Sequence, residues 1–209
     1  MAIIYGMEAA IKEAKKAHRD RTYPIGAVIV NPEGKVIGRG RNHIYSRGDY
    51  TSHAEVEAIH SAGGQLMKQE NFGRCTLYTT MEPCLMCSGA ILLAHICQVV
   101  WLISNADHGA LNCLHKDLQG RQKPLLSAFY QNRMDSLTIS CIDWYNEALG
   151  YKEVKERSEA WKSDMMNLMN EWTERKKNSS PEELLCRESF LQQLLSPVYA
   201  IVPVLKFSR

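Results

Sequence analysis

The sequence has 209 residues, a formal net charge of +2, 45% hydrophobic residues and 23% charged residues. These values are ordinary for a soluble globular protein, and they exclude a disordered chain and one that binds nucleic acid through overall charge alone. No apolar run approaches the about 18 residues of a membrane span, no signal peptide is evident, and seven cysteines without a paired framework favour a reducing compartment, so we expect a cytoplasmic protein.

The first hundred residues predict helices that alternate with strands. The N-terminal segment is amphipathic, with Met7, Ile11 and Ala14 on one face. Residues 25–30 and 35–38 are apolar runs joined by the turn sequence NPEG, which predicts a hairpin. The next elements are a helix in SHAEVEAIHSA (52–62), a strand in RCTLYTT (74–80), a helix in MEPCLMCSGAILLAHI (81–96) and a strand in CQVVWLIS (97–104).

This alternation favours an α/β fold with a partly parallel sheet. In the helix at 52–62, we expect Val56, Ile59 and His60 to face the core. His60 and His95 lie in apolar helices, which favours packing roles for both over metal binding.

The second half of the chain predicts a helical extension. Residues 104–120 form a polar loop, DSLTISCI (135–142) a further strand, and residues 144–177 a helix with an apolar stripe. The sequence SSPEE around residues 179–183 predicts a second helix with a capping box. The apolar segment at 196–207 is an edge strand at best because Pro203 interrupts it. We therefore divide the chain into a domain of residues 1–143 and an extension of residues 144–209, packed on the same domain or on a neighbouring subunit.

Four residues predict a catalytic zinc site. His53 and Glu55 are two positions apart, so they do not share a helix face, but they can surround an object in front of the helix. Cys84 and Cys87 have the spacing with which two thiolates bind one ion at the start of a helix. His53, Cys84 and Cys87 would leave one position of a tetrahedral zinc ion open, as in catalytic sites, where zinc lowers the pKa of water. Glu55 would then transfer protons as the catalytic acid and base.

The sequences HAE (53–55) and PCLMC (83–87) match the signature of zinc deaminases. Together with GAVIV, GRGRN, LYTTMEPCLMCSGAI and VVW, they make residues 5–115 resemble the cytidine-deaminase-like superfamily, in particular the branch of guanine deaminases and tRNA adenosine deaminases. The resemblance implies a three-layer α/β/α sandwich around a mixed five-stranded sheet, one zinc ion per chain and a homodimer.

The resemblance also implies substrate contacts. Asn42 matches an asparagine that touches the base or sugar, and Asp107 falls about where guanine deaminases place an acid that reads the purine. Backbone groups at three further positions would line the pocket: Ala54, Glu82 and Pro83. The chain has DYTSHAE where DPTAHAE is common, so Tyr50 adds a ring that could stack on a base.

These observations predict a zinc-dependent nucleobase or nucleoside deaminase that releases ammonia, with a free purine or purine nucleoside as the favoured substrate because of Asp107. The alternative is adenosine in a tRNA anticodon loop, which requires a basic rim for phosphates. Candidates for that rim are Arg39, Arg41, Arg47, Arg175, Lys176 and Lys177. A cytosine or cytidine substrate is a further alternative, as is a catalytically silent, zinc-stabilised partner subunit, although such a subunit would not need Glu55.

A purely structural zinc site is the remaining alternative, and it would need a fourth protein ligand. The candidates for that ligand are Cys75, Cys97, His108, Cys113 and His115. His43 and His108 fall on loops near the expected pocket and could belong to the site or to the surface.

Overall fold

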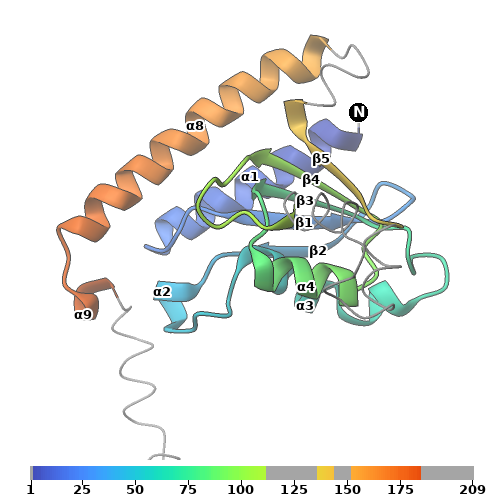
Figure 1. Ribbon diagram of the computed structural model, residues 1–209, viewed down its shortest axis with the longest axis horizontal. Coiled ribbons are helices and arrows are strands. Elements are labelled where there is room, and N and C mark those ends of the chain that lie inside the picture. Colours follow the sequence, from blue (N-terminus) through green and yellow to red (C-terminus); the bar gives the residue numbers. More distant parts are fainter. Residues whose placement is uncertain (1, 112–135, 144–151, 185–209) are drawn as a thin grey trace, which may run out of the picture.

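A mixed five-stranded sheet separates two layers of helices in the computed structural model (Figure 1). The structure describes residues 2–111, 136–143 and 152–184. The strand order is β2-β1-β3-β4-β5; β1 is antiparallel to β2 and β3, whereas β3, β4 and β5 run parallel. This arrangement confirms the predicted fold class. The strands are β1 (Gly26–Val30), β2 (Val36–Arg41), β3 (Thr76–Met81), β4 (Gln98–Ile103) and β5 (Thr138–Cys141).

The helices cover both faces of the sheet, with α1 and α8 on one side and α3 and α4 on the other (Figure 1). Side chains alternate along a strand, so a strand covered on both faces must be apolar at successive positions. In β4, Val99 and Trp101 belong to the core under α3 and α4, while Val100 and Leu102 belong to the core under α1 and α8. The helices are α1 (Ala2–Arg19), α2 (Ile44–Arg47), α3 (Ala54–Ala62), the 3₁₀ helix η1 (Gly63–Met67), α4 (Leu85–Leu93), α8 (Lys152–Lys177) and α9 (Pro181–Leu184).

Helix α3 packs on β2 at very short range because the strand presents glycines to it. A Cβ atom at Gly40 would lie 2.1 Å from the carbonyl oxygen of Ala54 and 2.3 Å from the amide nitrogen of Ala58. A Cβ atom at Gly38 would lie 2.4 Å from the carbonyl oxygen of Ala58 and 2.8 Å from the Cβ atom of Ala62. Only glycine permits this approach, and it holds the start of α3 against the sheet.

The same contact overturns part of one sequence-based prediction. The inner face of α3 is formed mainly by its alanines; Ile59 is half-buried and packs against the same core as predicted, whereas Val56 is only half-buried and His60 is exposed. The periodicity of large apolar residues was the wrong guide here, since glycines in the strand select small residues on the helix.

Helix α8 lies along α1 and closes that face of the sheet. Val154, Met165 and Trp172 are buried, which confirms the predicted apolar stripe. Ion pairs support the contact with α1: Arg157 with Glu8 at 2.8 Å, and Lys15 with Asp164 at 3.1 Å.

The capping box at α9 is also confirmed. Ser180 Oγ accepts a hydrogen bond from the Glu183 amide at 3.2 Å, and the Glu183 carboxylate accepts one from the Ser180 amide at 2.8 Å. The predicted start of the long helix at 144–151, most of the polar loop (112–120) and the apolar segment at 196–207 lie outside the described residues. The boundary between residues 143 and 144 therefore stays a prediction. Within the described ranges, no helix combines the length and the apolar character needed to cross a membrane.

Candidate active site

The starts of two helices bring three metal-binding side chains together. His53 is the N-cap of α3, Cys84 is the N-cap of α4, and Cys87 lies in the first turn of α4. His53 Nδ1 is 3.6 Å from Cys84 Sγ and 3.5 Å from Cys87 Sγ, and the three ligand atoms lie within 4.8 Å of one another. Zinc with bonds of about 2.0–2.3 Å in tetrahedral geometry separates its ligand atoms by about 3.5 Å, so the residues fit a zinc ion.

The described residues offer three protein ligands and no fourth. Cys75 and Cys97 precede the parallel strands β3 and β4, where Cys97 Sγ donates to the Cys75 carbonyl oxygen at 3.2 Å, whereas Cys84 follows β3 at the other end of the sheet. His108 lines the pocket but is not among the clustered ligands. The other two candidates for a fourth ligand, Cys113 and His115, lie outside the described residues. Three ligands with an open position are typical of catalytic zinc.

The thiols and the imidazole influence one another. Cys87 and then His53 act as hydrogen-bonding partners of Cys84 and lower its pKa to about 3. Cys84 in turn raises the pKa of His53. Cys84 is therefore a thiolate at neutral pH, which is the form that binds metal.

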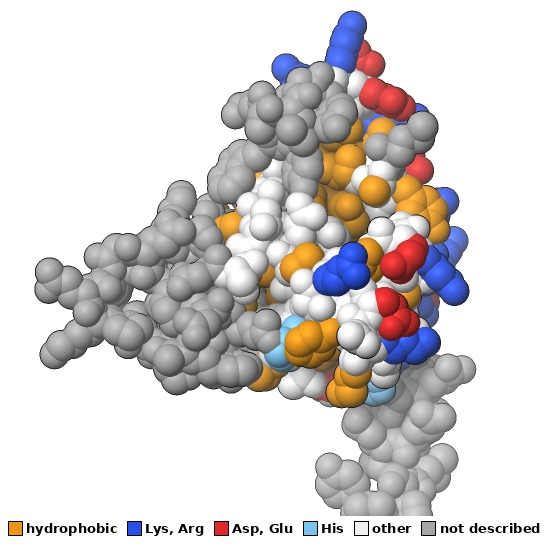
Figure 2. Space-filling model, turned by 90° about the vertical axis from the view of Figure 1, so that its right-hand side faces the viewer, with side chains coloured by type: hydrophobic (Ala, Val, Ile, Leu, Met, Phe, Trp, Pro, Cys, Tyr) orange, Lys and Arg blue, Asp and Glu red, His pale blue; other side chains and the backbone are white. Residues whose placement is uncertain are grey.

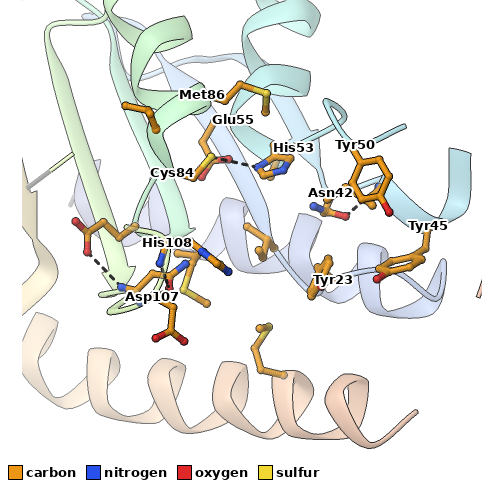
Figure 3. Close-up of a pocket in the computed structure, with 18 of the residues that line it drawn as sticks. Tyr23, Asn42, Tyr45, Tyr50, His53, Glu55, Cys84, Met86, Asp107 and His108 are labelled. Carbon is orange, nitrogen blue, oxygen red and sulfur yellow. Dashed lines mark hydrogen bonds between the residues drawn. The ribbon is translucent and has the colours of Figure 1, made fainter. Parts of the chain in front are cut away.

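Glu55 lies beside this cluster and is held in place from two sides. Its side chain is buried, Thr79 Oγ1 of β3 donates to Oε1 at 2.8 Å, and the Cys87 thiol donates to Oε2 at 3.3 Å. Burial raises the pKa of Glu55. A carboxyl group with a raised pKa can accept a proton and release it again, as a catalytic acid and base must. Figure 3 shows Glu55, His53 and Cys84 close together, with His108 and Asp107 on one side of them and Asn42 on the other.

The pocket that contains this cluster has a volume of about 750 Å³, which is within the range of small-molecule sites. Asn42 lines it and is buried, and its Oδ1 atom accepts hydrogen bonds from Thr22 Oγ1 at 2.7 Å and from the Ile44 amide at 3.0 Å. These bonds fix the amide orientation, and in Figure 3 the Asn42 nitrogen is on the side of His53. The NH₂ group of Asn42 is thus a donor available to a ligand.

The other residues that we expected at the substrate lie in different surroundings. Ala54 and Glu82 line the pocket, and Glu82 also accepts a hydrogen bond from the Asn105 amide at 3.2 Å, which fixes the loop after β4. Asp107 lines the pocket with an exposed side chain. Pro83 is buried and is not among the lining residues, although its carbonyl oxygen accepts a bond from the Ala110 amide at 3.0 Å. Their roles toward a substrate stay predictions.

Sequence reasoning missed one wall of the pocket. Tyr23, Tyr45, Met169 and Lys176 contribute to it. Lys176 is the one of the six basic residues considered for a phosphate rim that lines the cavity. Met169 and Lys176 belong to α8, far along the chain from the zinc ligands. Their spacing relative to Trp172 in the apolar stripe was the available signal, since residues three and four apart share a helix face.

Comparison with known proteins identifies the family. The family model for the cytidine and deoxycytidylate deaminase zinc-binding region matches residues 2–103. The chain is 38% identical over 107 residues to a tRNA-specific adenosine deaminase of Aquifex aeolicus, a match that covers 51% of this chain and 70% of the relative. The chain belongs to this zinc-binding deaminase family. The family's zinc-binding region contains the triad of His53, Cys84 and Cys87, so the predicted zinc cofactor is confirmed at the level of the family.

Other similar proteins show how far the similarity extends. The chain is 41% identical over 105 residues to a tRNA(Ile)-lysidine synthase of Deinococcus radiodurans, but the match spans only 18% of that protein and half of this chain. A structure from a study of A-to-I editing by tRNA:A34 deaminases is 29% identical, with a TM-score of 0.52 over 66% of this chain and 97% of the other. A guanine deaminase from Nitrosomonas europaea has a TM-score of 0.53 at 16% identity, covering 80% of this chain and 82% of the other, which is a likeness of fold alone.

Proposed function

We propose that the protein is a hydrolytic deaminase of adenosine in RNA, with the anticodon loop of a tRNA as substrate. In this reaction, the oxygen of water replaces the exocyclic amine of the base, and ammonia leaves. The observation that carries the proposed chemistry is the buried Glu55 carboxylate, 3.3 Å from Cys87 Sγ and inside the same cavity as the zinc ligands.

The relatives favour the RNA substrate over a free purine. The Aquifex aeolicus relative, of which the chain covers 70%, is a tRNA-specific adenosine deaminase. The structure that is 29% identical comes from a study of tRNA:A34 deaminases. The guanine deaminase is similar in fold alone. Asp107, on which our preference for a purine base rested, has an exposed side chain. The tRNA alternative is therefore better supported than the free purine that we favoured from sequence.

The chain's own residues define the proton transfers. Zinc, when held by the triad, supplies Lewis-acid activation of water. Glu55 takes a proton from the attacking water and delivers it to the leaving amine, while the hydrogen bond from Thr79 holds one carboxylate oxygen in place. Asn42 donates its NH₂ group to the base or ribose, and its orientation is set by Thr22.

The mouth of the pocket offers a surface for a flipped base. Tyr50 lines the cavity and is 82% exposed, so its ring is available for stacking. The face drawn in Figure 2, which is the right-hand side of Figure 1, shows described Lys and Arg side chains next to Asp and Glu. This mixture of charges offers no continuous basic surface, and the RNA contact that we propose lies at the pocket mouth, beside Tyr50.

We also propose a homodimer, as the family resemblance implies. Helix α4 exposes Leu85 and Leu93, which are 65% and 56% accessible, and Met67 of η1 is 82% accessible. Exposed large apolar side chains of this kind are candidates for the contact between subunits, although Leu85 also lines the pocket. Sedimentation of the zinc-loaded protein would test the dimer.

Ammonia release by the zinc-loaded protein tests the function. The panel contains an anticodon stem-loop with adenosine at the wobble position, adenosine, guanine and cytidine. We expect turnover of the stem-loop and a loss of about 10²–10⁴-fold in Glu55→Ala. Glu57→Ala is the matched control, because Glu57 lies one half-turn further along α3 and pairs with Arg47 at 2.8 Å outside the pocket lining.

Turnover of guanine alone would replace the RNA substrate with a free base. Turnover of cytidine alone would support the cytidine-type alternative. Absence of turnover with every substrate would favour the silent partner subunit.

A further inference from the structure

Helix α8 contributes a wall to the active-site pocket from outside the segment that matches the family. The family model ends at residue 103, whereas Met169 and Lys176 of α8 line the same cavity as His53 and Glu55. Met169, Trp172 and Lys176 are spaced three and four residues apart, so they occupy one face of the helix. Met169 and Lys176 on that face line the pocket, while Trp172 is buried behind it.

Lys176 is held in a defined position by aromatic side chains. Its ammonium group donates to the Tyr23 hydroxyl at 2.8 Å and lies 5.3 Å from the centre of the Tyr23 ring and 5.7 Å from that of Tyr45. Both rings pack on the fully buried Trp172, at centroid distances of 5.5 Å and 5.2 Å. A lysine usually loses side-chain entropy when it binds a ligand, and these contacts reduce that cost in advance.

Among the described residues, no carboxylate forms an ion pair with Lys176. The neighbouring acids of α8 have other partners: Glu174 pairs with Lys177 at 2.6 Å, and Glu171 with His18 at 3.3 Å. Asp107 also lines the pocket, but it lies on the far side of Figure 3 from Tyr45, which marks the Lys176 side. The pocket therefore has a positive charge at the edge formed by α8.

We propose that Lys176, held by Tyr23 and Tyr45, binds a phosphate group attached to the nucleoside that is deaminated. The inference rests on the proposed deaminase function and specifies the substrate class as a phosphate-bearing nucleotide rather than a free base. A lysine ammonium is a common phosphate ligand because it acts as a point charge with three donors. In this arrangement the base lies toward Glu55 and the phosphate toward Lys176, since both side chains line the same cavity of about 750 Å³.

Binding and turnover of Lys176→Gln test the proposal. Lys177→Gln is the matched control, since it removes the same charge one residue away, at a side chain that pairs with Glu174 and does not line the pocket. Binding is measured by fluorescence anisotropy in zinc-loaded protein that carries Glu55→Ala, so the result does not depend on turnover. The probes are the anticodon stem-loop and adenosine 5′-monophosphate, which distinguish an RNA phosphodiester from a free nucleotide, with inorganic phosphate as competitor.

We expect Lys176→Gln to weaken binding of at least one phosphate-bearing probe about tenfold relative to Lys177→Gln. For the stem-loop, the slope of log affinity against log salt should fall by about one. In the active enzyme, KM for that substrate should rise more than kcat falls. Equal affinities of the two variants for both probes would overturn the inference, even if the stem-loop is deaminated. A Lys176 effect on binding without turnover of any substrate would instead refute the deaminase function and leave the phosphate site standing.

Discussion

The contact between Gly40 and α3 makes the zinc site sensitive to a single methyl group. In Gly40→Ala the new Cβ atom would lie 2.1 Å from the Ala54 carbonyl oxygen, about 1.3 Å short of the 3.4 Å at which ordinary contacts begin. Both neighbouring atoms belong to the helix backbone, so no side chain can rotate away. The start of α3, with His53 and Glu55, must shift by about 1 Å relative to Cys84 on α4.

We expect two consequences of that shift. Overpacking costs about 1–3 kcal/mol of unfolding free energy, which lowers the melting temperature by about 2–4 °C per kcal/mol in a chain of this size. A displacement of about 1 Å in the catalytic geometry lowers kcat/KM about 10²-fold.

Thermal unfolding, zinc content and deamination of the stem-loop would be measured on Gly40→Ala and on Gly64→Ala. Gly64 lies in η1, directly after α3, and a Cβ atom there would meet nothing within 4 Å, so this variant should behave as wild type. If Gly40→Ala melts at the wild-type temperature, the close contact does not limit the packing of α3. If it is destabilised but keeps full zinc content and activity, the position of α3 does not control the site.

Two further predictions concern polar groups around the pocket. Thr79→Val removes the hydroxyl that donates to Glu55 at nearly constant volume, and we expect kcat to fall about tenfold with KM and zinc content little changed; an unchanged kcat would show that Thr79 does not position the carboxylate. Burial, and then Arg47, lowers the pKa of His43 below 6.5, so the folded state disfavours its protonation. The contribution of neutral His43 to the free energy of unfolding is therefore fully present above about pH 6.5 and is lost as the pH falls through the pKa of His43 in the folded state. Thermal melts between pH 7.5 and 5.5 should show a smaller loss of stability in His43→Gln than in the wild type, and parallel curves would contradict this assignment.

The zinc cluster could be predicted from sequence because its chemistry is local. His53 and the cysteine pair each begin a helix, and the residue types with their spacing specify a metal site before any tertiary contact is known. The alternating elements likewise predict an α/β fold with a partly parallel sheet, and the family resemblance implies the two helical layers. The inner face of α3 could not be predicted in this way, because it depends on which strand lies opposite. Gly38 and Gly40 of β2 select alanines there, and no periodicity within the helix records that.

By itself, the sequence predicted the three zinc ligands and Glu55 as the proton-transfer candidate from residue type and short-range spacing, and it predicted the fold class from the alternation of its elements and from the family resemblance. Only the tertiary structure decided what surrounds them. It placed Thr79 against Glu55 and brought Lys176 to the pocket from α8, contacts that depend on how the layers pack. Of the six basic residues considered for a phosphate rim, it directed one into the cavity, because the buried Trp172 sets the rotation of the helix that carries it.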